Sequence, residues 1–246
     1  MRTHTTLVIN SKGGSGKTTV TSNLASYFAA KAMAVTVMDY DPQGSSLAWL
    51  ALRQPPLNRI YAANAARQKG IRLRGIEMHV PTDTRHLIID APAGASGLLL
   101  QEMLSRADCI VIPVAPSPID IHATAHFIRD LLLAGRIRAR NIQLAVIANR
   151  VRRSTPAYAP LERFLTALGL PLLARLADSE VFLKAAETGV GVFEMDSAEG
   201  EDEREQFRPI AEWVASQQEP APRADEKILP FRPRYAVAGV SSAFMK

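Results

Sequence analysis

Residues 10–19 combine small residues with two lysines in a pattern that can bind phosphate, reading Asn-Ser-Lys-Gly-Gly-Ser-Gly-Lys-Thr-Thr. Glycines let backbone N–H groups turn inward onto anionic oxygens, and the start of a following helix adds a positive dipole end. Lys17 can then reach the terminal phosphates of a nucleotide, and the Thr18 hydroxyl can bind Mg²⁺. The residues predicted to hold the nucleotide in this loop are Lys12, Gly13, Gly14, Ser15, Gly16, Lys17, Thr18 and Thr19.

The loop departs from the usual phosphate-binding template at its beginning. The template is Gly-x-x-x-x-Gly-Lys-[Ser/Thr], but Ser11 stands at the first glycine position and Lys12 is an additional cation. Lys12 is too far from Lys17 along the loop to duplicate its role. It could project outward, toward a nucleotide held by another copy of the chain. The residues alone equally allow a solvated loop lysine.

Three acids that follow apolar strands could complete the chemistry. Phosphoryl transfer needs a neutralising metal and a positioned water more than it needs covalent help. Asp39, Asp41 and Asp90 are the candidates for these two tasks; Asp90 would bind Mg²⁺ through water, and Asp39, at the end of its strand, would support the metal shell or fix the loop. Taken singly, each acid could also be a helix cap or a turn residue. No glutamine or glutamate of these loops is an obvious stronger base, which predicts slow intrinsic hydrolysis.

These residues need a scaffold whose strands end at one edge, and the chain alternates apolar strands with helices. Such alternation predicts an α/β fold, a single domain with a mostly parallel twisted sheet and helices on both faces. The predicted strands are residues 7–10, 35–39, 87–90, 110–114, 143–149 and 172–176. The predicted helices are residues 18–31, 45–53, 97–105, 119–134, 159–168, 180–188 and 203–216. In the less regular segment 54–81 we expect a helix at residues 62–69 and an edge strand near residues 76–80.

Composition excludes several classes of protein. The 246 residues are 47% hydrophobic, which suits a globular domain with a substantial core. The single Cys109 excludes an internal disulfide framework and the paired cysteines of an iron–sulfur cluster. The N-terminus is polar and leads directly into the first strand, and no stretch approaches the length of a membrane span, so we expect a cytoplasmic protein. The prolines after residue 218 predict a P-loop domain over residues 1–218 and a mobile tail over residues 219–246.

Three segments together resemble one family. Residues 12–19 resemble the deviant Walker A box of the ParA/MinD ATPases. Residues 39–46 resemble the Asp-x-Asp-Pro-Gln-Gly segment typical of the ParA branch, and residues 86–94 resemble the family's Walker B strand and second switch. The resemblance covers about residues 5–215. It implies a short ParA-like partition or positioning ATPase, with ATP and Mg²⁺ as cofactors.

The resemblance also implies roles for particular residues. In the family the extra lysine, here Lys12, crosses the interface of an ATP-sandwich homodimer and contacts the partner's nucleotide. Asn149 matches an asparagine that reads adenine, and the loop holding Ala177 and Asp178 would approach the base from the other side. The implied catalytic residues are Lys12, Lys17 and Asp41, and the implied metal residues are Thr18, Asp41 and Asp90.

Positive charge is concentrated in one third of the chain. The formal net charge is +5, yet residues 129–175 hold nine arginines against two acids. A basic surface binds phosphate backbones without reading sequence, and ParA-like proteins bind double-stranded DNA non-specifically as ATP dimers. The candidate DNA-binding residues are Arg136, Arg138, Arg140, Arg152, Arg153, Arg163 and Arg175. A solvated arginine-rich face is the alternative.

Three functions are compatible with these motifs. A ParA-like ATPase would bind the nucleoid and move a plasmid, a chromosome or an assembly such as a carboxysome, with a ParB-like or adaptor partner that stimulates hydrolysis. A MinD-like ATPase would end in a basic amphipathic helix that enters a membrane, which the prolines within residues 227–246 disfavour. An amidoligase-type enzyme on this fold would need a substrate pocket of its own. We therefore expect the first function, in the cytoplasm at the nucleoid, without a membrane partner.

Overall fold

One parallel sheet organises the molecule. The computed structural model describes residues 2–66, 78–133, 137, 140–152, 159–196 and 198–217. Within them, seven strands lie in the order β3-β2-β4-β1-β5-β6-β7, and every neighbouring pair is parallel. The strands are β1 His4–Val8, β2 Val35–Asp39, β3 Ile60–Asn64, β4 His86–Asp90, β5 Cys109–Val114, β6 Gln143–Val151 and β7 Leu172–Ala177. The predicted α/β fold is thereby confirmed.

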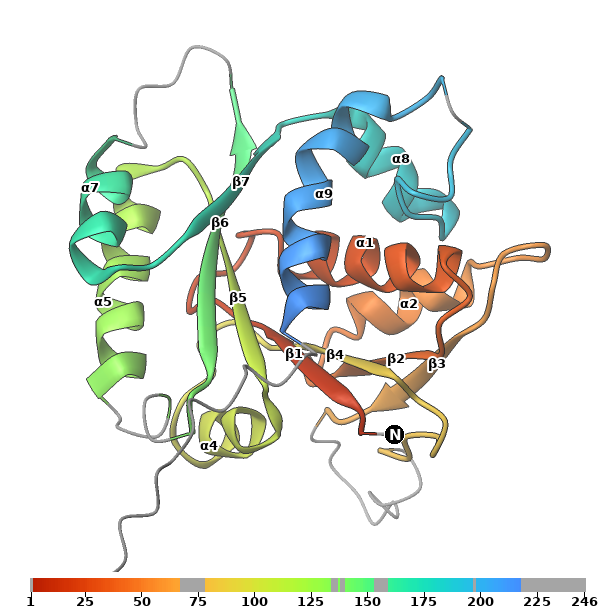
Figure 1. Ribbon diagram of the computed structural model, residues 1–246, viewed down its shortest axis with the longest axis horizontal. Helices are drawn as coiled ribbons and strands as arrows, with labels where there is room; N and C mark the ends of the chain where they lie inside the picture. The colour runs from red at the N-terminus through yellow and green to blue at the C-terminus, as the bar shows by residue number, and fades with distance from the viewer. Residues whose placement is uncertain are drawn as a thin grey trace, which may run out of the picture.

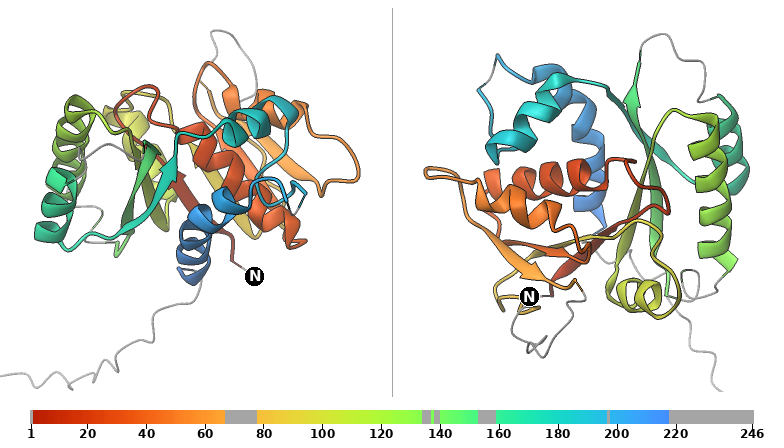
Figure 2. Two further views of the ribbon diagram at one scale, coloured as in Figure 1. Left: turned by 90° about the horizontal axis from the view of Figure 1, so that it is seen from above. Right: turned by 180° about the vertical axis from the view of Figure 1, so that it is seen from behind.

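Helices cover both faces of this sheet (Figure 1, Figure 2). One face carries α4 Gly97–Arg106, α5 Pro118–Leu133 and α7 Ala159–Leu168. The other face carries α1 Lys17–Ala30, α2 Ser45–Ala51, α8 Glu180–Thr188 and α9 Glu201–Ser216. None of the helices in the described part of the chain is long and apolar enough to cross a membrane.

The side chains of the central strands alternate between the two faces of the sheet and contribute to two separate hydrophobic cores. In β1, Leu7 belongs to the core beneath α4 and α5, whereas Val8 belongs to the core beneath α1 and α9. Successive strand residues point to opposite faces, so a strand that is covered on both sides has buried residues on both faces. Every residue of β1, β2, β4 and β5 is buried. The order of strands reverses at β1, which lies between β4 and β5, and open α/β sheets bind ligands at such a point.

The helix that was predicted at residues 62–69, between α2 and β4, is wrong in its first three residues. Residues 62–64, expected to begin a helix, belong to strand β3, which pairs with β2 in the register Val35↔Ile60 to Asp39↔Asn64. The alanines in this segment favour a helix only weakly, and pairing along an open sheet edge outweighs that preference. Of the edge strand expected near residues 76–80, residues 78–80 are not in a strand and the others lie outside the described residues.

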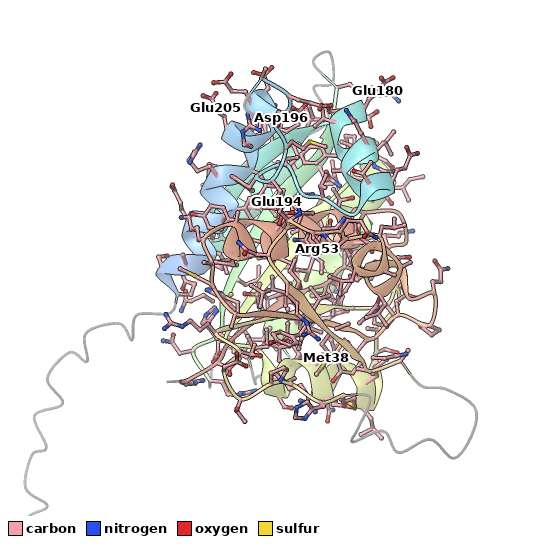
Figure 3. The ribbon with its side chains drawn as sticks, turned by 90° about the vertical axis from the view of Figure 1, so that its right-hand side faces the viewer. Met38, Arg53, Glu180, Glu194, Asp196 and Glu205 are labelled. Carbon is pink, nitrogen blue, oxygen red and sulfur yellow. The ribbon has the colours of Figure 1, made fainter. Side chains whose placement is uncertain are left out.

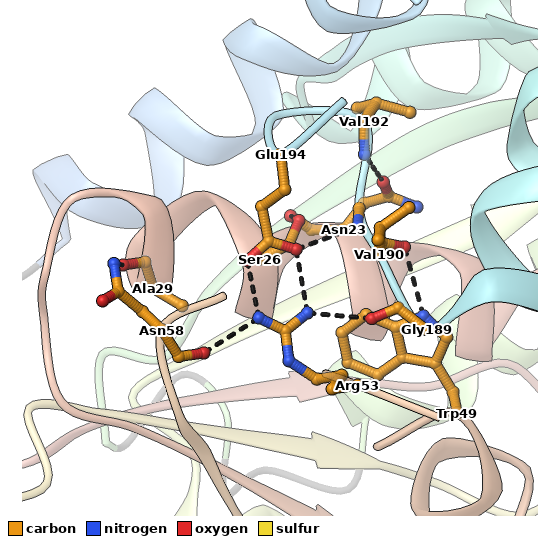
Figure 4. A network of polar contacts seen from close by, with 11 residues as sticks. Asn23, Ser26, Ala29, Trp49, Arg53, Asn58, Gly189, Val190, Val192 and Glu194 are labelled. Atoms are coloured by element: carbon orange, nitrogen blue, oxygen red, sulfur yellow. Dashed lines mark hydrogen bonds and ion pairs between the residues drawn. The ribbon is translucent and has the colours of Figure 1, made fainter. Parts of the chain in front are cut away.

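A buried ion pair joins the end of α2 to the segment after α8. Arg53 donates to both carboxylate oxygens of Glu194, from Nη2 to Oε1 at 2.6 Å and from Nη1 to Oε2 at 2.8 Å. Their side chains are only 7% and 4% exposed, and Figure 3 shows both residues inside the molecule. Arg53 also donates to the carbonyls of Asn58 and Gly189 (Figure 4). The guanidinium is thus surrounded by acceptors, which a buried cation requires.

The same segment is fastened to α1. The N–H of Val192 donates to Asn23 Oδ1 at 2.9 Å, and Trp49 of α2 donates to the carbonyl of Val190 at 3.2 Å. A Cβ atom on Gly191 would lie 1.7 Å from Ser26 Oγ of α1, so only glycine allows this approach. Helices α1, α2 and α8 are therefore held together by residues 189–194.

We expect Glu194→Gln to lower the free energy of unfolding by about 3 kcal/mol, because Arg53 would remain buried without an opposite charge. Urea unfolding measures the loss. The matched control is Glu199→Gln, which breaks the exposed pair with Lys184 (side chains 40% and 58% exposed) and should cost at most about 1 kcal/mol. Equal losses in the two variants would contradict a structural role for the buried pair.

Candidate nucleotide-binding site

The phosphate-binding loop begins at the carboxyl end of β1 and is anchored by Asn10. The Asn10 amide donates to the carbonyl of Pro113 at 2.7 Å and to Thr124 Oγ1 at 3.0 Å, while its oxygen accepts the N–H of Lys12 at 3.3 Å. The carbonyl of Ser11 accepts the N–H of Gly94 at 3.0 Å. The loop is thereby fixed to β5, to α5 and to the loop after β4.

Two glycines shape the second half of the loop. Gly14 and Gly16 have φ angles of +72° and +93°, and Gly16 caps the start of α1. The amide of Asn149 donates to the carbonyl of Ser15 at 2.9 Å. A Cβ atom on Gly16 would lie 1.8 Å from the amide nitrogen of Asn149. The asparagine that was expected to read the base therefore also contacts the phosphate-binding loop and leaves space only for glycine.

The two lysines of the loop differ in their surroundings. Lys17 is 8% exposed, and its Nζ donates to the carbonyl of Lys12 at 3.2 Å. Burial lowers the pKa of Lys17, against the carboxylates of Asp90 and Asp41, which raise it. Lys12 is half-buried, and its own contacts to the described residues come from its backbone. Lys17 is thus directed into the loop, whereas the Lys12 ammonium has no described partner there.

Asp39 and Asp41, which both follow β2, differ in burial and in their hydrogen-bond partners. Asp39 is fully buried, and its carboxylate accepts the N–H groups of Asp41 at 2.8 Å and Ser46 at 3.1 Å. Asp39 therefore fixes the loop after β2. Burial raises the pKa of Asp39, against these N–H donors, which lower it. Asp41 accepts the N–H of Gln43 at 2.9 Å, which is a turn contact. Its carboxylate also acts on Lys17 of the phosphate-binding loop, whose pKa it raises.

Asp90 ends β4 and lies beneath both α1 and α2. It is 1% exposed, and its Oδ2 accepts hydroxyl groups from Thr18 at 2.9 Å and from Ser46. Its Oδ1 is buried and has no partner among the described residues. Burial raises the pKa of Asp90 to about 7, and the Ser46 hydroxyl opposes that rise. A cation beside Asp90 would favour its charged form, and the Thr18 hydroxyl and the Asp90 carboxylate, which are in contact, are oxygen ligands of the kind that Mg²⁺ prefers.

A cavity of about 310 Å³ lies beside the loop, where a base could bind. It brings together the three predicted base contacts, Asn149, Ala177 and Asp178. The N–H of Ala177 donates to Gln206 of α9 at 2.7 Å, so this backbone donor is engaged within the protein. Thr19 of the phosphate-binding loop and Ser179, next to Asp178, also line the cavity, and the lining residues that the sequence did not predict as base contacts are Arg150, Phe182, Leu183 and Ala186. The spacing of Phe182 and Ala186 indicates one helix face but not which cavity that face lines.

A second hollow, of about 450 Å³, separates the loops that follow β2 and β4. Its lining comprises Tyr40, Asp41, Pro42, Gln43, Leu99 and residues 92–96. Tyr40 donates from its hydroxyl to Glu102 of α4 at 3.0 Å. The predicted catalytic Asp41 therefore lies at the rim of a surface depression and not in a closed chamber.

The candidate DNA-binding arginines that the structure describes are Arg140, Arg152, Arg163 and Arg175, and they differ in position and in partners. Arg140 precedes β6 and Arg152 follows it, so the nine-residue strand separates them by about 30 Å. Arg140 donates to the carbonyl of Leu104 at 2.7 Å, and Arg175 is paired with Glu162. Arg152 pairs with Asp178 at 3.2 Å but remains 76% exposed, and Arg163 is exposed on α7. The other three, Arg136, Arg138 and Arg153, lie outside the described residues.

Comparison with known proteins places this site within a family. Residues 6–192 match the model of the CobQ/CobB/MinD/ParA nucleotide binding domain. The maintenance of carboxysome distribution protein A of Halothiobacillus neapolitanus is 25% identical over 198 residues, which cover 78% of this chain and 87% of that protein.

Two solved structures share the fold. An ATP complex of a McdA variant from Cyanothece has a TM-score of 0.66 and 16% identity, covering 89% of this chain and 98% of that one. The septum site-determining protein MinD of Pyrococcus horikoshii, complexed with Mg-ADP, has a TM-score of 0.63 and 20% identity, covering 87% and 96%. At these identities the likeness supports the fold alone.

We expect Gly16→Ala to destabilise the protein more than Gly14→Ala. Both glycines have positive φ, which costs an alanine about 1–2 kcal/mol, but a Cβ on Gly14 would have no atom within 4 Å. Gly16→Ala also displaces Asn149 from Ser15, at a further cost of about 1–3 kcal/mol. Urea unfolding of both variants tests this. In an Asn149→Ala background the excess cost at Gly16 should disappear, and persistence of the full excess there would contradict the steric explanation.

Proposed function

Because the chain belongs to the family of CobQ/CobB/MinD/ParA nucleotide binding domains, we propose that it is a ParA-like positioning ATPase. In this proposal it binds ATP and Mg²⁺, forms a homodimer, and binds double-stranded DNA non-specifically as the dimer. Hydrolysis, slow by itself and stimulated by a ParB-like or adaptor partner, releases the dimer from DNA. The observation that carries the proposal is the loop in which Lys17 is directed inward and Lys12 is not.

The residues at the carboxyl edge of the sheet have complementary roles in this proposal. Lys17 would bind the terminal phosphates, and Thr18 and Asp90 would hold the Mg²⁺ shell. A bound Mg²⁺ would neutralise charge on the phosphate oxygens. Asp41, at the rim of the hollow between the two loops, would orient the attacking water. Asn149, Ala177, Asp178 and the apolar side chains of α8 would surround the base.

Dimerisation would give Lys12 its role. Its ammonium has no partner among the described residues, and the neighbouring hollow is lined by the loops after β2 and β4. A second copy facing this edge would bring its nucleotide to Lys12 and would exclude water from both sites. Charge in such a water-poor interface acts more strongly than in solvent.

Binding to DNA would use arginines that have no internal task. Of the candidates in the described part of the chain, Arg163 is exposed on α7 and has no partner among the described residues, whereas Arg152 is paired with Asp178. The first turn of α9 is acidic, with Glu201, Asp202 and Glu203, and Figure 3 shows Glu180, Asp196 and Glu205 at the same end of the molecule. Because like charges repel, DNA would approach away from this acidic end.

A protein assembly is the cargo that the comparisons favour. The relative from Halothiobacillus neapolitanus is named for carboxysome distribution, so a carboxysome-like assembly with its adaptor is the first candidate for this chain. A MinD-like cycle on a membrane is the second candidate, because the MinD structure has the same fold.

Co-sedimentation separates these two functions. With ATP and Mg²⁺, the wild-type chain should bind double-stranded DNA of random sequence and should leave vesicles of anionic lipid unbound. ADP should abolish DNA binding, and raising the salt concentration should weaken it steeply because phosphate contacts release counterions. Binding to vesicles but not to DNA would favour the membrane cycle. Nucleotide-independent DNA binding would contradict the proposed switch.

Replacing the two lysines should separate nucleotide binding from dimerisation. We expect Lys17→Ala to lose ATP binding, because no other described cation is directed into the loop. Lys12→Gln should keep ATP affinity within about fivefold, since one solvent-accessible ion pair is worth under about 1 kcal/mol, yet remain a monomer. Light scattering with ATP and Mg²⁺ measures the mass, and Lys31→Gln at the far end of α1 is the control. A dimeric Lys12→Gln variant would refute the role of Lys12.

A further inference from the structure

The backbone and the hydroxyl of Ser46 connect two buried acids. Asp39 and Asp90 end β2 and β4 and are direct partners in the register of these parallel strands. The N–H of Ser46 donates to Asp39 Oδ2 at 3.1 Å, and its Oγ donates to Asp90 Oδ2. Ser46 itself has no exposed surface. Both of its donors are therefore committed to carboxylates that would otherwise repel each other.

The contact with Asp90 reaches the expected metal ligand Thr18. Asp90 Oδ2 accepts two hydroxyls, one from Thr18 of α1 and one from Ser46 of α2. A hydroxyl that donates its proton to a carboxylate turns its lone pairs away from that carboxylate. Thr18 can then offer an oxygen lone pair to a cation. The orientation of Asp90 sets that of Thr18, and Ser46 holds the same carboxylate oxygen from the other helix.

We propose that Ser46 is a positioning residue for Mg²⁺, acting through Asp90. This inference rests on the proposed ATPase function and assigns to Ser46 a part that the sequence analysis did not identify. Without the Ser46 hydroxyl, Asp90 Oδ2 keeps Thr18 as its only donor among the described residues, and the carboxylate can rotate. The affinity for Mg²⁺ then falls, whereas the contacts that the loop makes with the nucleotide itself do not change.

Ser45 provides a matched control within the same turn. Ser45 and Ser46 are the first two residues of α2, but Ser45 is exposed and Ser46 is fully buried. Ser45→Ala removes the same group from the same helix without touching either acid. A change that follows only Ser46→Ala is therefore due to its contact with Asp90 and not to the properties of the helix.

The test is the binding of fluorescent ADP, followed by anisotropy while Mg²⁺ is varied from an EDTA baseline. For Ser46→Ala we expect the Mg²⁺ concentration at half-maximal binding to rise about tenfold, the effect of losing one hydrogen bond to a charged group. Its ADP affinity in EDTA should stay within about twofold of the wild type, and Ser45→Ala should match the wild type throughout. An unchanged Mg²⁺ midpoint, or an equal loss with and without Mg²⁺, would overturn the inference.

A second variant shows whether Ser46 acts through Asp90. In an Asp90→Asn background, adding Ser46→Ala should shift the Mg²⁺ midpoint by less than about twofold, because interacting residues are not additive. A second full shift would mean that Ser46 acts by another route and would overturn the inference. Absence of ADP binding by the wild-type chain would instead overturn the proposed ATPase function, and this inference with it.

Discussion

Two buried carboxylates, side by side at the ends of β2 and β4, impose the main constraint on this structure. Burying a charged group is costly unless hydrogen bonds or opposite charges compensate it. Asp39 obtains its donors from the loop after β2 and from the start of α2, and Asp90 obtains hydroxyls from the starts of α1 and α2. Both helices must therefore begin where the acids lie. The positions of the phosphate-binding loop and of the Asp41 loop follow from this requirement.

The rest of the scaffold keeps these starting points fixed. Asn10 ties the phosphate-binding loop to β5 and α5, and Asn149 ties it to β6. The Arg53–Glu194 pair joins the end of α2 to the segment after α8. Because α8 lines the cavity beside the phosphate-binding loop, the candidate sites for base, phosphate and metal belong to one connected body. A change at one of these sites can then reach the others through contacts between helices.

The sequence alone allowed the phosphate-binding loop and the acids at strand ends to be predicted. It did not allow the contacts between residues that are distant in the sequence to be predicted. Lys17, Thr18 and Asp90 were predicted because a phosphate-binding loop and a strand ending in an acid have recognisable spacing, and the structure brings them together. Ser46 and Gln206 were missed because their partners, Asp90 and Ala177, are distant in the sequence. Strand β3 was misread for the same reason, since its pairing with β2 outweighs its local preference.

The DNA surface suggested by nine arginines in one third of the chain stays a prediction. Among its described residues, β6 separates Arg140 from Arg152, and Arg175 is paired with Glu162. A guanidinium that caps a helix carbonyl or neutralises a carboxylate contributes less to a phosphate-binding face. Of the described candidates, Arg163 is exposed without a described ion pair, and Arg152 is 76% exposed beside Asp178. If the proposed dimer forms, it would bring two copies of each of these arginines to one particle.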